Sequence, residues 1–164
     1  MNAKDVIKTA LDSNRNMLTM YLSDLSDADL LVRPAPGANH IAWQLGHLID
    51  AEANFVLPNV PGAAAVELPA GFAAKHTKET AAKDSPGDFL KKEEYLALLK
   101  KVRAATLAAL AKIPDADLDR PTPEKMASYA PNVGALFLIA ATHDMMHGGQ
   151  FTVVRRKLGK PVLF

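Results

Sequence analysis

The segment Asn132–Leu158, NVGALFLIAATHDMMHGGQFTVVRRKL, decides the fold of this chain. It contains no proline, its apolar residues recur at helical spacing, and its basic end suits the negative end of a helix dipole. At about 100° per residue, one stripe of the predicted helix holds Leu136, Ile139, Ala140, His143, His147, Gln150, Val154 and Leu158. The opposite face holds Asp144, Gly148, Thr152 and Arg155. The pattern therefore predicts two histidines and a glutamine on the buried face of a long helix.

His143 and His147 are one helical turn apart, which puts their Cβ atoms roughly 5–6 Å apart on one side of the helix. Two imidazoles at this spacing can share a metal ion, as the histidines of the HExxH zinc helix do. Here Asp144 follows the first histidine, so the pattern lacks the glutamate base of a zinc protease. Two histidines cannot complete a metal site, and a pair of hydrogen-bonded core histidines is an equal alternative.

Length and composition favour one globular domain over residues 1–164. Hydrophobic residues make up 49% of the chain and charged residues 23%, which suffices for a full core. The net charge is +1 and the basic residues are scattered, so we expect no binding to nucleic acid or to membranes. The absence of cysteine excludes disulfides, thiolate ligands and a cysteine nucleophile. The amphipathic start is no signal peptide and no segment is long enough to span a bilayer, so a cytoplasmic protein is expected.

Helices are also expected over about 3–24 and about 89–113. The first has an apolar stripe broad enough to pack on two neighbours. Asn14 falls inside this stripe, where we favour a structural role over contact with a site. The later helix has apolar residues at steps of three and four, and its other face carries Lys92, Lys100 and Arg103.

Another helix is expected over about 39–57, from the N-cap Asn39 to the residue before a proline. Its apolar face includes Glu52, whose carboxylate must find a cation, a metal, a donor or water, because burying it unpaired is costly. His47 lies beside this face, one turn after Trp43.

The connection over 59–88 is expected to be irregular, because prolines and glycines interrupt it and no period persists. A connection this long is uncommon in a compact domain and indicates a crossover or a cover for a site. His76 lies here among lysines and is expected to be solvated.

The sequence DADL occurs twice, at 27–30 and 115–118, each time soon followed by Arg-Pro. Both halves of the chain therefore consist of a helix, a short turn, a proline-rich link and a helix bearing histidine. This predicts an all-α four-helix bundle with a long crossover between helices two and three, its halves related by a pseudo-twofold. If the second and fourth helices pack together, His47 can face His143 and His147, and three histidines with open positions are the ligand set of a catalytic metal site. Three separate core histidines are the alternative.

The motifs LGHLIDAE at 45–52 and HDMMHGGQ at 143–150, followed by RRKLGKP, resemble the DinB superfamily of bacterial four-helix bundles. The DADL turns and the closing GKPVLF also fit, so the resemblance covers essentially the whole chain. It implies an up-down-down-up bundle, often a homodimer. In that family one histidine on helix two and two on helix four bind a divalent metal, commonly zinc or nickel. They match His47, His143 and His147.

The resemblance further implies a small-molecule substrate, since some members are transferases or isomerases that use a low-molecular-weight thiol such as bacillithiol, mycothiol or glutathione. Our preferred reaction is S-transfer through a metal-bound thiolate, because a metal held by neutral imidazoles lowers the pKa of a bound thiol. The alternatives are a metal-dependent hydrolase and a non-catalytic metal-binding bundle, which a fourth protein ligand would close. The candidates to support the ligands or line a pocket are Trp43, Glu52, Gln150 and Asn14.

Two further expectations concern the surroundings of the metal and the dimer. The candidates for a fourth ligand are Gln150, Glu52 and Asp144, of which Asp144 is disfavoured because it points about 100° away from His143. Apolar residues outside the main stripes of the first and third helices support the homodimer; they are Met17, Met20, Leu96, Leu98 and Leu107.

Overall fold

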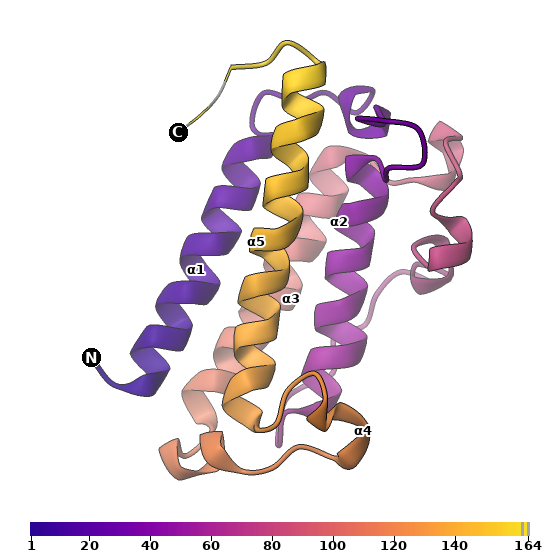
Figure 1. The fold of residues 1–164 in the computed structure, drawn as a ribbon. Coiled ribbons are helices and arrows are strands. Elements are labelled where there is room, and N and C mark those ends of the chain that lie inside the picture. Colours follow the sequence, from indigo (N-terminus) through magenta and orange to yellow (C-terminus); the bar gives the residue numbers. More distant parts are fainter. Residues whose placement is uncertain (162, 164) are drawn as a thin grey trace.

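The computed structural model describes residues 1–161 and 163, and their long helices pack side by side in one bundle (Figure 1). The long elements are α1 (Ala3–Leu22), α2 (Ile41–Asp50) continued by the π-helical η2 (Ala51–Val56), α3 (Lys92–Lys112) and α5 (Val133–Lys157). The expected ranges were 3–24, 39–57, 89–113 and 132–158. In Figure 1, α1 and α5 run in one direction and α2 and α3 in the other, which confirms the all-α, up-down-down-up prediction.

The remaining elements are short. The two DADL sequences form the 3₁₀ turns η1 (Asp29–Leu31) and η7 (Asp115–Asp119), and a one-turn helix, α4 (Glu124–Ala127), precedes α5. The described residues contain one isolated β-bridge and no strand. None of the helices in the described part of the chain has the length and apolarity needed to cross a bilayer. Two residues of the closing GKPVLF motif, Val162 and Phe164, lie outside the described residues.

Local sequence sets where the helices begin. The side chain of Asn2 accepts from the backbone N–H of Asp5, whose carboxylate accepts in return from the N–H of Asn2. Asn132 likewise caps α5. The cap of α2 differs from the expectation, because the Nδ1 of His40, and not the side chain of Asn39, accepts the Trp43 N–H.

Helix α5 is buried on two sides, which corrects the single-stripe prediction. It packs most extensively on α1 and also contacts α2. The face that was expected to be polar meets α1, so Asp144, Gly148 and Arg155 are buried there. Gln150, expected on the buried face, is exposed. A helix that packs between two neighbours buries a wider arc than one hydrophobic stripe covers. A prediction of the buried residues from one stripe therefore fails for residues at the edges of that stripe and beyond it.

The connection from η3 (Leu57–Asn59) to α3 lies beside α2, on the side away from α1 (Figure 1). It contains only the short turns η4 (Ala73–Lys75), η5 (Lys78–Thr80) and η6 (Pro86–Asp88). The expectation that His76 is solvated was wrong, since its side chain is 2% exposed. Its neighbours Lys75 and Lys78 do face solvent, and these lysines dominated the sequence signal.

His76 anchors this connection to the bundle. Its Nδ1–H donates to the carbonyl of Phe72, and its Nε2 accepts from the hydroxyl of Tyr95 on α3. The imidazole also lies directly on Gly46 of α2, where the ring would overlap with any added Cβ. Glycine at this position therefore allows the close approach of the connection to the helix.

Candidate metal centre

The bundle brings together the three histidines singled out in the sequence. His47 comes from α2, and His143 and His147 come from α5. One nitrogen of each ring lies within 4.8 Å of the others. The ring centroids are 5.0 Å apart for His47 and His143, 5.5 Å for His47 and His147, and 4.8 Å for the last pair. We refer to these three residues as the histidine site.

A glutamine that the sequence analysis missed orients the innermost histidine. The amide nitrogen of Gln44 donates to the carbonyl of Asn39 at 2.8 Å, which leaves its Oε1 free to accept. The Nδ1 of His147 lies 2.8 Å from that oxygen, so we assign the proton to Nδ1 and the lone pair to Nε2. Such a bond to the outer nitrogen is the usual support of a metal-ligating histidine. Gln44 lies one turn before His47, a spacing that could have identified it.

The inner nitrogens fit a cation. The Nε2 of His147 faces the Nε2 of His143 at 3.2 Å. Either the Nε2–H of His143 donates to the lone pair of His147, or a metal ion takes the place of this proton between the two nitrogens. Three imidazole nitrogens are a ligand set that zinc, nickel and copper accept.

The histidines are also in the protonation state that binds metals. Burial, with the charges of the other two imidazoles, lowers the pKa of His147 to about 3. Burial and the charge of His47 lower the pKa of His143 to about 4. Burial likewise lowers the pKa of His47, helped by the positive charge of Lys78 and opposed by Asp50. All three are therefore neutral near pH 7, as metal ligation requires.

Trp43 connects the histidine site to the long connection. Its ring stacks on His47, with centroids 5.1 Å apart and planes 8° from parallel. Its Nε1–H donates to the carbonyl of Thr77 at 3.0 Å. The position of His47 is thus coupled through one side chain to the segment around η5.

A groove beside the histidine site gives small molecules access to His47 and His143. Its volume is about 750 Å³, within the usual size of small-molecule sites. It is lined by His47, Leu48, Asp50, Ala51, Glu52, Phe55, Val56, Lys78, Tyr129, Ile139, Ala140, Thr142, His143, Asp144 and Met146. His147 does not line the groove and is 4% exposed, so it forms the inner side of the site.

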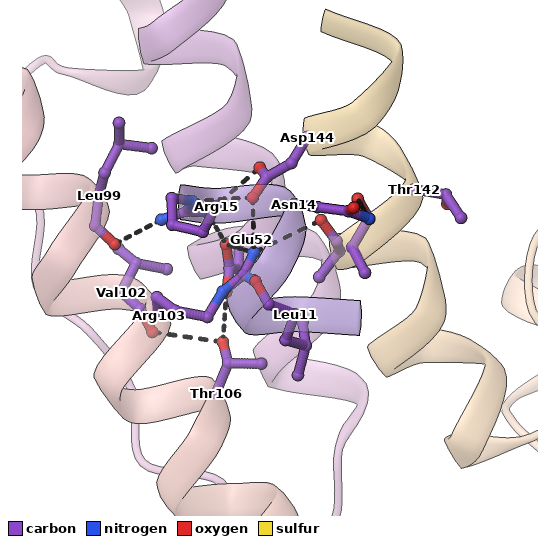
Figure 2. A network of polar contacts seen from close by, with 12 residues as sticks. Leu11, Asn14, Arg15, Glu52, Leu99, Val102, Arg103, Thr106, Thr142 and Asp144 are labelled. Atoms are coloured by element: carbon purple, nitrogen blue, oxygen red, sulfur yellow. Dashed lines mark hydrogen bonds and ion pairs between the residues drawn. The ribbon is translucent and has the colours of Figure 1, made fainter. Parts of the chain in front are cut away.

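Below the groove, all four long elements are joined by a buried polar network of Arg15, Glu52, Arg103, Thr106 and Asp144 (Figure 2). Arg15 of α1 donates to Asp144 at 2.8 Å and to Glu52 at 2.7 Å. Arg103 of α3 donates to the same two carboxylates at 3.1 and 2.8 Å. Two guanidinium groups thus balance two carboxylates.

The network shows that the buried Glu52 pairs with two arginines. It also shows that Arg103 lies inside the bundle and not on a polar face. Burial alone would raise the pKa of the Glu52 carboxyl, but Arg15 and Arg103 outweigh this and hold the pKa below its ordinary value. Arg103 was expected on a polar face and is 4% exposed. Both arginines occupy apolar helical positions, four residues after Leu11 and Leu99 respectively, and this signal could have identified them.

Two of the expected site residues lie outside the site. The exposed Gln150 neither contacts the histidines nor lines the groove. Asn14 donates to the backbone carbonyl of Ala141 at 2.8 Å and ties α1 to α5, the structural role that was favoured. Glu52 and Asp144 do line the groove, but their oxygens are bonded to the arginines of the network.

Comparison with known proteins agrees with this architecture. The profile of the DinB superfamily matches residues 10–151. A crystal structure described as the conserved protein of a locus from Enterococcus faecalis superposes with a TM-score of 0.68 at 19% identity, covering 98% of this chain and 99% of that one. At that identity the likeness supports the fold alone. Comparison with curated proteins gave no significant match.

Proposed function

This chain belongs to the DinB superfamily, and on that premise we propose that His47, His143 and His147 hold one divalent metal ion that acts on a small molecule in the groove. The observation that carries the proposal is the convergence of three neutral imidazoles within 4.8 Å, one of them oriented by Gln44. Zinc and nickel are the preferred ions, because both suit imidazole ligands.

The surroundings of the histidine site support an open site over a closed structural one. A structural site is closed by a fourth protein ligand. The candidates for that role are engaged elsewhere: Glu52 and Asp144 are bonded to arginines, and Gln150 is exposed to solvent. Among the described residues, the group of potential metal-binding side chains contains the three histidines and no carboxylate.

We favour thiol-dependent group transfer as the reaction. When bound, a metal ion here would lower the pKa of a thiol or water ligand and supply a nucleophile at neutral pH. Hydrolysis would also profit from a carboxylate base near the histidines, but Glu52 and Asp144 are neutralised by Arg15 and Arg103. A thiol needs no such base once its pKa is low, and the chain, which has no cysteine, would take the thiol from solution.

Metal content is the first test. Elemental analysis of the purified protein should give about one divalent ion per chain, and His147→Ala should lose it while retaining helical circular dichroism. Gln150→Ala is the matched control, since this side chain is exposed and outside the site. A wild-type protein that takes up neither zinc nor nickel after incubation would refute the metal site.

The reaction class is tested on the cobalt-loaded protein. Titration with low-molecular-weight thiols should add an intense thiolate-to-metal charge-transfer band and release a proton, because the thiol must bind as thiolate. If glutathione, bacillithiol and mycothiol all leave the spectrum unchanged, the transferase proposal fails and metal-dependent hydrolysis becomes the better one.

We also propose that the chain forms a homodimer through the outer face of α5. Leu138, Met145 and Val153 recur there at steps of seven and eight residues and are 41%, 48% and 49% exposed. The side chains expected to form the interface are all half-buried. Four of them pack against the chain's own core, namely Met17, Leu96, Leu98 and Leu107; the fifth is Met20. Light scattering should give a dimer mass for the wild type and a single-chain mass for Leu138→Glu with Val153→Glu. A single-chain mass for the wild type at micromolar concentration would exclude the dimer.

A further inference from the structure

The exposed surface of the groove is largely apolar, although four charged side chains also line it. Aliphatic side chains such as Leu48, Val56 and Ile139 form part of its walls. Phe55 and Tyr129 also line it, with their rings edge to face at 5.6 Å. Phe55 follows His47 by two turns, roughly 12 Å at 1.5 Å per residue. A ligand that reaches the histidines therefore has room for an apolar body of several carbon atoms along these walls.

The charges of the groove differ in whether the protein itself neutralises them. Glu52 and Asp144 are paired with the arginines of the polar network. Asp50 accepts a hydrogen bond from the neutral amide of Asn54 at 2.7 Å and so keeps its negative charge. Lys78 is the one cation among the described residues that line the groove, and its ammonium forms no ion pair with them.

The backbone that carries Lys78 is fixed beside the histidine site. Thr77, the residue before it, accepts from the Nε1–H of Trp43, whose ring stacks on His47. Thr80 closes the turn by donating to the carbonyl of Thr77 at 2.9 Å. One residue further back, the buried His76 bonds to α3 and packs on α2. The backbone at Lys78 is therefore held beside the groove, and its exposed side chain extends from this fixed point.

We propose that Lys78 is a specificity-determining residue that binds a carboxylate of the ligand, so that the histidine site receives organic acids with an apolar body and a thiol. The inference rests on the proposed metal site and adds the substrate class to it. A neutral analogue would leave the ammonium solvated and gain nothing from it. A carboxylate gains a charge pair at the rim of a largely apolar groove, where the attraction is stronger than in open water.

The test compares acids with their neutral amides. Straight-chain mercaptocarboxylates of increasing length, each with its amide, are titrated into cobalt-loaded protein, and the charge-transfer band gives the dissociation constants. At the best length, wild-type protein should prefer the acid over the amide by roughly two- to five-fold, the range of an exposed ion pair. Lys78→Ala should abolish the preference and Lys78→Glu should reverse it, both without changing the affinity for the amide.

Lys75→Ala is the matched control, because this lysine is exposed on the same segment and lies outside the groove. It should keep the wild-type preference. A wild-type protein without preference at any length, or a preference that survives in Lys78→Ala, would overturn the inference. Both results would leave the metal site standing, since the band itself reports thiol binding to the metal.

If no thiol changes the cobalt spectrum, the thiol-dependent function fails and the role of Lys78 is decided without metal. 3-Phenylpropionate and its amide are then titrated into the metal-free protein and followed by amide chemical shifts of groove residues. An acid preference that Lys78→Ala removes supports the inference for organic acids in general, and equal binding of acid and amide refutes it.

Discussion

Replacing Glu52 with glutamine tests whether the buried polar network holds the bundle together. Glu52 is 3% exposed and accepts from Arg15 at 2.7 Å, from Arg103 at 2.8 and 3.0 Å, and from Thr106 at 2.7 Å. In Glu52→Gln the shape is kept, but two buried guanidinium groups are left with the single carboxylate of Asp144. Removing one partner of a buried ion pair costs about 3–5 kcal/mol.

That loss is a large part of the stability of a domain, which is about 5–15 kcal/mol. For a chain of this size, about 2–4 °C of Tm are lost per kcal/mol, so Tm should fall by roughly 6–20 °C. Urea unfolding followed by circular dichroism near pH 7 measures the free energy directly. Asp12→Asn, which breaks the exposed pair with Lys8, is the control and should cost less than about 0.5 kcal/mol.

The pH dependence and a paired replacement complete the test. Because the pKa of Glu52 is lowered in the folded protein, its contribution is full above the ordinary glutamate pKa of about 4.3 and is lost as the pH falls through the lowered value. The difference in unfolding free energy between wild type and Glu52→Gln should therefore shrink in acid.

Glu52→Leu combined with Arg103→Met removes one charge of each sign and should be more stable than either single variant. A loss below about 1 kcal/mol in Glu52→Gln, or a double variant less stable than both single ones, would refute the reasoning.

Three further outcomes are expected. Gln44→Ala should weaken nickel binding roughly 10- to 100-fold, measured by quenching of the sole tryptophan, Trp43; unchanged affinity would mean that Gln44 does not orient the ligand. Gly46→Ala should displace His76 and speed proteolysis of the long connection. In the control Gly149→Ala the added methyl group meets open space, so this variant should be more stable than the wild type by about 0.5–1 kcal/mol. Equal rates of proteolysis in the two variants would contradict the role of His76 as an anchor. Because the pKa values of His143 and His147 are lowered to about 4 and 3, protons do not compete for these two imidazoles between about pH 7.5 and 5.5. Nickel affinity should therefore fall over this range by no more than the protonation of one histidine explains; a loss as steep as two or three titrating histidines produce would contradict this.

The sequence by itself determined the class of fold and identified the three histidines that the bundle brings together. The helical period of the segment over 132–158, the repeated DADL turns and the punctuation of the 59–88 connection are local signals, and local backbone preferences follow them. The spacing of His143 and His147 fixes a shared helix face in the same way, since one turn separates them whatever the helix packs against.

Only the tertiary structure decided which arcs of each helix are buried and which charges meet. A period reveals one apolar stripe, but α5 packs against α1 as well as α2, so Asp144 is buried and Gln150 is exposed, against the pattern. One partner of Asp144 is Arg15, 129 residues away along the chain, and no local signal connects them. A charged side chain can be buried at a tolerable cost only when it is paired with an opposite charge, and here the partners come from other helices. The pairing is therefore a property of the packed bundle, and so is the closeness of His76 to Gly46 that fixes the connection beside the histidine site.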